Sequence, residues 1–242
     1  MMSIRRAEER GRSTHGGWLR SAHTFSFGDY FDLRHQGHGN LRVINDDTVA
    51  PAHGFGAHGH RDMEIVSYVL DGELSHKDSM GNGEAGGENS GIMRPGDVQR
   101  MSAGTGVLHS EFNNSREQPV HFLQIWILPK FKGIRPGYEQ RHYSTTERQG
   151  RLRLIVSPDG ADGSVSINAD ARIEAGLFND REQVHRQLDP GRLTYVHLAR
   201  GQITLNGHVL NGGDGALLDG ESELALAAGK AAEVLVFDLR RE

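Results

Sequence analysis

The sequence has no cysteine among its 242 residues, so the protein has neither disulfides nor thiolate ligands. Any transition-metal site must therefore use imidazole and carboxylate groups. Long hydrophobic runs are also missing, because the longest apolar stretch, Val120 to Pro129, is interrupted by His121 and Gln124. That stretch is far shorter than the roughly 20 residues of a spanning helix, which predicts no membrane partner.

The chain also lacks an excess of positive charge. Its formal net charge is −5, with 27 basic and 32 acidic residues, which argues against nucleic acid as a partner. The charged segment that ends at Arg12 is not followed by the apolar region of a signal peptide. The sequence therefore predicts a cytoplasmic protein.

Glycine and histidine, by contrast, are abundant. The 32 glycines predict many tight turns. Of the 14 histidines, only His185, His197 and His208 lie beyond residue 150. Because histidine is the commonest metal ligand and a frequent general base, we expect the chemistry in the N-terminal part.

Apolar residues recur with a period of two, which is typical of β-strands. Such runs lie at 41–44, 65–70, 120–128, 193–199, 223–227 and 234–237. The pairs Asp71-Gly72 and Asn206-Gly207 favour hairpin turns between strands. The pattern predicts an all-β, antiparallel protein built from barrels or sandwiches, and the length favours two of them.

Two similar halves are also indicated by a weak internal repeat. The segment Tyr68 to Leu74 resembles His197 to Ile203, and each is followed by a Gly-Asp turn. A polar, turn-rich break runs from Lys130 to Gly150. We place the boundary near residue 144, which predicts domains 1–143 and 144–242.

One arrangement of residues indicates a metal site. His58 and His60 are two residues apart, so on a strand their side chains leave the same face about 7 Å apart. His109 and Glu111 repeat this spacing with an imidazole and a carboxylate. If the two strands face each other inside a barrel, the four groups can surround one metal ion. A single pair would more often belong to a solvated turn, but the coincidence of two pairs favours the metal site.

Other candidates have less support. His53 precedes His58 by five residues and could approach the site. His76 and Asp78 have the same spacing of two, but their position after the Asp71-Gly72 turn favours a solvated hairpin arm over a second site.

These residues resemble a known family. The His-x-His pair, the turn Pro95-Gly96-Asp97 and the segment from His109 to Asn113 resemble the two motifs of the cupin superfamily, small antiparallel barrels with a metal inside. Longer strings resemble the pirin family, close to bacterial members described as quercetin 2,3-dioxygenases. They lie at 23–27, 42–47, 56–65, 77–82, 102–111 and 124–127. The resemblance covers most of residues 15–143 and is weaker beyond.

The resemblance implies a bicupin, two antiparallel β-barrel or jelly-roll domains packed together. It implies that His58, His60, His109 and Glu111 hold one divalent transition metal, with iron expected and copper, nickel, manganese, cobalt or zinc left open. In many cupins a glutamate just after His-x-His is the carboxylate ligand. In pirins that role passes from the position of Glu64 to that of Glu111.

The C-terminal half is expected to be structural. A rough alignment of the two halves puts Gln187, Asp189, Leu226 and Ala228 where the first half has its ligands. These residues cannot form an equivalent ligand set, so the second barrel is predicted to lack a metal.

The resemblance further implies a dioxygenase that opens the ring of quercetin-like flavonols with dioxygen and releases carbon monoxide. Its partners are then a flavonol and dioxygen, with Glu111 as ligand or nearby base for the flavonol hydroxyl. Phe25, Phe27, Phe55 and Met63 could line an apolar entrance, although core packing is the commoner role.

Two other functions stay open. A regulatory pirin would modulate a partner protein or metabolic enzyme in a metal-dependent way, and another cupin reaction, such as sugar isomerisation, could use the same ligands. The oligomeric state is not readable from the sequence, and a monomer is compatible with it.

Overall fold

The computed structural model describes residues 2–84 and 91–241, which form mostly β-strands. Within these ranges the helices are three short segments: the 3-10 helices η1, Ala7–Glu9, and η2, Ala161–Gly163, and the α-helix α1, Thr145–Arg148. None of the helices in this part of the chain is long and apolar enough to cross a membrane. The predicted all-β class is confirmed.

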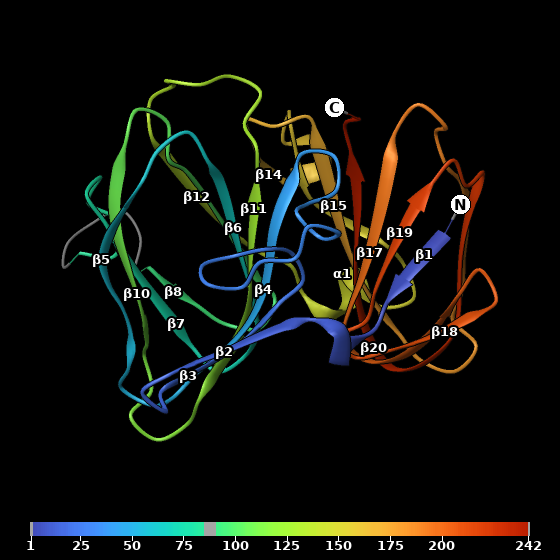
Figure 1. The fold of residues 1–242 in the computed structure, drawn as a ribbon, viewed down its shortest axis with the longest axis horizontal. Coiled ribbons are helices and arrows are strands. Elements are labelled where there is room, and N and C mark those ends of the chain that lie inside the picture. The colour runs from blue at the N-terminus through green and yellow to red at the C-terminus, as the bar shows by residue number, and fades with distance from the viewer. Residues whose placement is uncertain (1, 85–90, 242) are drawn as a thin grey trace.

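Two facing sheets form the N-terminal barrel, on the left of Figure 1. The first has seven strands in the order β12-β9-β6-β11-β4-β3-β2. They span Gly11–His15 (β2), Leu19–His23 (β3), Leu41–Val49 (β4), Glu64–Asp71 (β6), Asp97–Ser102 (β9), Val120–Ile127 (β11) and Gly137–His142 (β12). The second has the order β5-β10-β7-β8, with strands Gly54–His60 (β5), Leu74–Asp78 (β7), Ile92–Met93 (β8) and Val107–Asn113 (β10).

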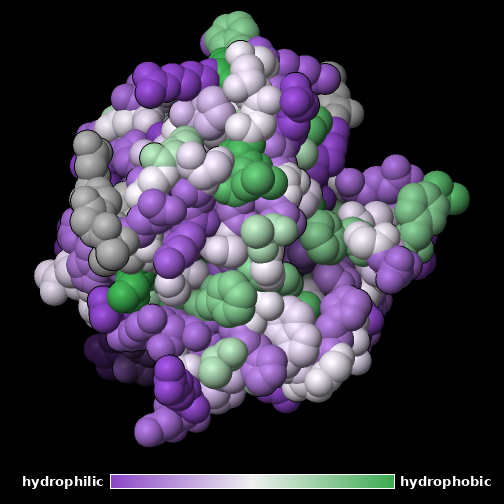
Figure 2. Space-filling model, turned by 90° about the vertical axis from the view of Figure 1, so that its left-hand side faces the viewer, coloured by the Kyte–Doolittle hydropathy of each residue, from purple (hydrophilic) through white to green (hydrophobic). Residues whose placement is uncertain are grey.

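The alternation of side chains along β10 shows how the four-stranded sheet separates inside from outside. His109 and Glu111 are each 3% exposed, whereas Leu108 and Phe112 are 58% and 43% exposed. Figure 2 views this side of the molecule, where apolar side chains form small patches separated by polar ones. The residues predicted to bind metal therefore lie on the inner face of the strand.

The third sheet has nine strands and forms the C-terminal barrel, on the right of Figure 1. Its main path is β1-β19-β17-β20-β15-β13-β14, while β16 pairs with β20 and β18 with β17. The strands span Met2–Arg5 (β1), Arg153–Ser157 (β13), Val165–Ser166 (β14), Ala171–Phe178 (β15), Val184–Gln187 (β16), Leu193–Leu205 (β17), His208–Asn211 (β18), Gly215–Asp219 (β19) and Glu223–Leu239 (β20). Only the short β13–β14 ladder is parallel among the described strands.

The long strands β17 and β20 bend this sheet. The first part of β17 pairs with β19 and its last part with β18, and its register with β20 shifts at three places between Leu198 and Thr204. Such bulges increase local twist and let a sheet curl. The enclosed space is filled by aliphatic side chains without exposed surface, including Val196, Leu198, Ile203, Leu205, Leu210, Leu224 and Leu226.

The first strand crosses from one half of the chain to the other. Met2 lies opposite Leu218 and Arg5 opposite Gly215, so β1 extends the C-terminal sheet at its β19 edge. Figure 1 shows this first strand beside the strands of the C-terminal barrel. The domain boundary near residue 144 stays a prediction, and residues 2–5 pair outside the unit to which that boundary assigns them.

The two barrels pack through the outer face of the seven-stranded sheet. Leu123 and Ile125 on β11 belong to the same buried cluster as Leu235 and Phe237 on β20. Because both faces of β11 are buried, this strand is almost continuously apolar. The seven-stranded sheet is thereby held against the second barrel while its inner face is free to carry polar groups.

Candidate metal centre

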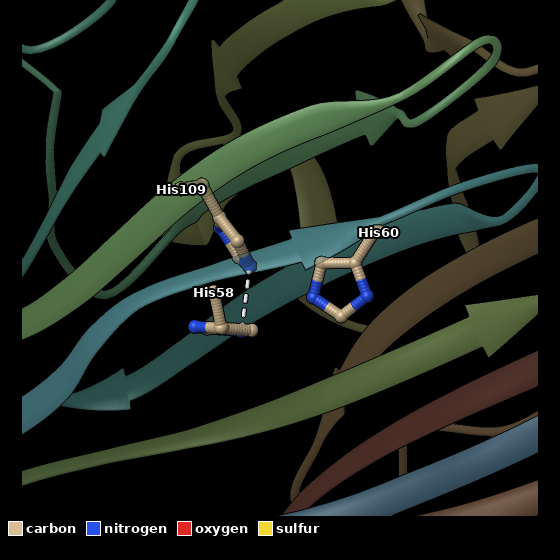
Figure 3. Close-up of side chains that lie close together, drawn as sticks. All are labelled: His58, His60 and His109. Carbon is tan, nitrogen blue, oxygen red and sulfur yellow. Dashed lines mark hydrogen bonds between the residues drawn. The ribbon is translucent and has the colours of Figure 1, made fainter.

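Three histidines meet inside the N-terminal barrel. Strands β5 and β10 pair in an antiparallel register that puts His58 opposite His109 and His60 opposite Val107. The Nε2 atoms of His58 and His109 lie 3.0 Å apart. His60 completes the cluster, with its ring centroid 4.9 Å from that of His58 and 4.8 Å from that of His109. Figure 3 shows the three rings grouped beside the two strands.

This cluster fits a metal ion. Nδ1 of His58 donates to the carbonyl of Gly56 at 2.8 Å, which leaves Nε2 as the ring nitrogen that can bind a metal. Two nitrogens bound at about 2.1 Å and at a right angle to one ion would lie about 3 Å apart, as the two Nε2 atoms do. Burial, with the neighbouring imidazoles second, lowers the pKa of His60 to about 4 and that of His109 to about 3. Both rings are then neutral near pH 7, which is the ligand form.

Glu111 lies next to this cluster but is directed by other contacts. One carboxylate oxygen accepts a hydrogen bond from Gln124 Nε2 at 2.7 Å, and the other accepts from Ser67 Oγ at 3.3 Å. Its oxygen lies within 4.8 Å of ligand nitrogens of His109 and His76. His109 therefore belongs to two candidate groups, and coordination by all four predicted residues stays a prediction.

His76 corrects one expectation. The sequence favoured a solvated hairpin arm, but His76 has no exposed surface and Asp78 is only 6% exposed. Gln99 Nε2 lies 3.1 Å from Nδ1 of His76, and Nε2 of His76 lies 3.0 Å from Asp78. The cause is register, because β7 pairs with β10 so that His76 lies opposite Glu111. The signal in the sequence was the spacing of two between His76 and Asp78.

A row of polar side chains on the seven-stranded sheet supports these groups from the opposite wall. Ser67 lies opposite both Gln99 and Gln124, and Gln124 lies opposite Asn45, which itself lies opposite His23. Cross-strand neighbours share a face, so the row runs across the sheet. It positions His76 and Glu111 through the hydrogen bonds already described.

A cavity of about 590 Å³ opens beside the centre. His58, Glu111 and Gln124 lie at its metal end, and aromatic side chains line much of the rest: Trp18, Phe27, Tyr30, Phe55 and Trp126. Of the two roles considered from the sequence, an apolar entrance and core packing, Phe27 and Phe55 thus have the first, because they line the cavity. Phe25 instead packs between the barrels, and Met63 packs against the small Ile65 cluster. The two tryptophans were not singled out from the sequence.

Two further candidates lie outside the cluster. His53 donates to the carbonyl of Pro51 and stacks on Trp18, and it belongs to neither group of candidate ligands. Glu64 accepts hydrogen bonds from Ser102 Oγ at 2.7 Å and from the backbone of Asn168 at 3.1 Å. It therefore joins the two halves of the chain instead of facing the histidines.

Comparison with known proteins identifies the fold family. The family model described as Pirin matches residues 4–127, and that described as Quercetinase C-terminal cupin domain matches residues 154–239. The chain belongs to the pirin family. Its architecture is that of two cupin domains, which confirms the predicted bicupin.

Relatives of this pirin cover its whole length. A protein of Escherichia coli named quercetin 2,3-dioxygenase is 42% identical, with 99% of each chain covered. The crystal structure of the E. coli pirin YhhW in complex with nickel(II) has a TM-score of 0.91, 40% identity and full coverage of both chains. A quercetin 2,3-dioxygenase of Acinetobacter baumannii, at 24% identity and a TM-score of 0.73 over 95% of this chain and 83% of that one, shares the fold.

The second barrel offers no comparable site among the residues that the structure describes. Both groups of candidate ligands lie in the N-terminal barrel. Of the aligned positions, Gln187, Asp189 and Ala228 are exposed, and Leu226 lies in the aliphatic core. That the second barrel has a purely structural role stays a prediction.

Proposed function

We propose that this pirin is a metal-dependent dioxygenase that opens the ring of quercetin-like flavonols with dioxygen and releases carbon monoxide. His58, His60, His109 and Glu111 would hold one divalent ion, with iron the expected metal. The observation that carries the proposal is the convergence of three histidines, with the pKa values of His60 and His109 lowered by burial, at the end of a cavity lined with aromatic residues. The name of the E. coli relative points to the same substrate class.

A bound divalent ion would supply Lewis-acid activation of the adjacent hydroxyl and carbonyl oxygens of a flavonol. The chain's own residues would do the rest. Glu111 can take up the hydroxyl proton, because Gln124 and Ser67 hold its two oxygens in place. The aromatic walls at Trp126 and Phe27 would pack against the flat rings and exclude water from the reacting end.

The test is dioxygen uptake with quercetin, using protein stripped of metal and reloaded with each candidate ion in turn. Elemental analysis of the protein as isolated would name the native ion. We expect metal-dependent uptake together with loss of the flavonol absorbance. Stoichiometric metal without turnover by any ion would contradict the dioxygenase and favour the regulatory alternative. The cytoplasmic location stays a prediction from the sequence.

A further inference from the structure

The cavity continues along the inner face of the seven-stranded sheet, well beyond the metal end. Gln124 touches Glu111, and His23 lies two strands further on, in the same polar row. Since neighbouring strands are about 4.8 Å apart, His23 is about 10 Å from Gln124. A ligand that fills this length must be longer than a single six-membered ring.

Asp47 stands out among the groups that line this extension. It follows Asn45 by two residues on β4 and so points to the same face. Its side chain lines the cavity, is only 5% exposed, and its Oδ1 has no hydrogen-bond partner among the described residues. Strand spacing puts it about 8 Å from Gln124, one strand across and two residues along. Buried polar groups are almost always paired, so a carboxyl oxygen without a protein partner beside a cavity points to a ligand donor.

The charge state of Asp47 suits recognition of a hydroxyl group. Burial raises its pKa to about 7, a hydrogen bond from Ser21 opposes the rise, and the charges of Asp46 and Glu111 add to it. Near neutral pH the carboxyl group is therefore present in both protonation states. It can accept a hydrogen bond from a hydroxyl group or donate one to it.

The walls beside this row favour a flat aromatic ligand. The rings of His60 and Trp126 are 5.0 Å apart between centroids, those of Trp126 and Phe27 5.3 Å, and those of Phe27 and His23 5.5 Å. This chain of rings runs from the histidine cluster to the far part of the polar row. A ligand that matches both walls has apolar faces and hydroxyl groups on its rim.

We propose that Asp47 is a specificity-determining residue, whose carboxyl group binds a hydroxyl group on a ring of the flavonol remote from the metal. The inference rests on the proposed flavonol function and adds a second polar anchor to it. It predicts a preference for polyhydroxylated flavonols over 3-hydroxyflavone, which keeps the metal-binding oxygens and has no other hydroxyl group. A site built to bind a hydroxyl rejects the analogue that lacks it, because the protein group then stays unpaired.

The experiment compares the binding of quercetin and 3-hydroxyflavone to the metal-containing protein without dioxygen, followed by quenching of tryptophan fluorescence. Trp18 and Trp126 line the cavity and report on its occupancy. We expect the wild-type protein to bind quercetin about tenfold more tightly than 3-hydroxyflavone, and Asp47→Ala, which can neither accept nor donate a hydrogen bond, to lose that preference. The matched control is Asp29→Ala, which removes the same group at an exposed position of the same cavity and should keep the preference.

The result that would overturn the proposal is an unchanged preference in Asp47→Ala. A thermal melt establishes that this variant is folded, and Asp47→Val, which suits a strand and also lacks a polar group, provides a second test if it is not. Dioxygen uptake by the wild-type protein is measured separately. Binding with no uptake contradicts the proposed reaction but leaves the anchor testable, whereas uptake with equal preference in wild type and variant contradicts only the role of Asp47.

Discussion

Inside the C-terminal barrel lie Leu198, Ile203 and Leu226, whereas inside the N-terminal barrel lie Ser67, Gln99 and Gln124, and all six are almost fully buried. The aliphatic filling stabilises the fold by removing apolar surface from water and needs no particular partner for any atom. Burial of the polar side chains is unfavourable unless each polar group forms a hydrogen bond. The interiors of the two barrels are therefore opposite in character, one aliphatic and the other polar.

The difference shows how a barrel can keep a polar interior. Apolar clusters close two regions of the N-terminal barrel, around Phe122 and around Met101, and the polar row lies on the strands between them. The outer face of the same sheet packs on the second barrel. The second barrel therefore contributes stability to a sheet whose inner face carries the polar row.

The largest effect is expected from removing the histidine that both candidate groups share. His109→Ala should lower metal affinity by more than about a hundredfold and abolish dioxygen uptake, because one strong ligand is lost. Elemental analysis after dialysis measures the first effect and an oxygen electrode the second. His208→Ala, an exposed histidine of the other barrel, is the control and should retain the metal. A His109→Ala protein with full metal content would refute the proposed centre.

A polar group placed inside the C-terminal barrel should strongly destabilise the fold. Leu226→Gln would bury an amide among aliphatic side chains, and we expect the free energy of unfolding to fall by about 4 kcal/mol. Urea denaturation followed by circular dichroism measures the change. The control Val209→Gln, at a position that is 46% exposed, should change the free energy of unfolding by less than about 0.5 kcal/mol. Equal effects at both positions would mean that the barrel interior is not close-packed.

The converse change, an apolar residue in the polar row, should act on the metal more than on the fold. Gln124→Leu removes the donor to Glu111 at 2.7 Å, and metal affinity should fall about 10- to 100-fold. Competition with a metal chelator gives the affinity. Gln202→Leu on β17 removes a side-chain hydrogen bond in the other barrel and should leave metal binding unchanged. Unaltered affinity in Gln124→Leu would show that Glu111 needs no support from the opposite wall.

The smallest effect concerns a buried histidine of β17. His197 has no exposed surface, its ring nitrogens lack partners among the described residues, and burial lowers its pKa to about 3. Below the unfolded pKa of about 6.5, the unfolded chain binds a proton that the folded protein excludes. Protonation of His197 in the unfolded chain should therefore lower the free energy of unfolding by about 2 kcal/mol as the pH falls from 7 to 5. It should change nothing above pH 7.

The measurement is urea denaturation at both pH values for the wild-type protein and for His197→Leu. The variant should lose less stability on acidification, and the difference between the two proteins isolates the histidine from other titrating groups. His208→Leu, exposed on β18, should follow the wild type. Parallel pH profiles for the wild type and His197→Leu would show that His197 is protonated or hydrated in the folded protein.

Much of the site could be anticipated because strand geometry converts spacing into direction. A spacing of two was enough to predict that His58 and His60 share one face of their strand. The same holds for His109 and Glu111 on theirs. The same rule applied to His76 and Asp78, but the turn before them suggested exposure. Whether a hairpin arm is buried depends on which strand covers it, and here β10 pairs with β7 from a distant part of the sequence.

Asp47 and Gln124 illustrate what spacing could not supply. Each lies in a string that resembles the pirin family, yet nothing in the string indicates which face of the strand meets the cavity. The register of β4 with β11 decides it, since Asn45 lies opposite Gln124 and Asp47 opposite Phe122. A shift by one residue would turn both side chains toward the other barrel.

The sequence by itself determined the all-β class, the pirin resemblance and the pairs of candidate ligands, because these follow from local periodicity and from specific strings of residues. Only the tertiary structure decided that the three pairs of residues and the polar row share one interior, that β1 joins the second barrel, and that His76 is buried. Those features depend on pairing between strands far apart in the chain. Such pairing is selected by packing over the whole molecule, which no local pattern contains.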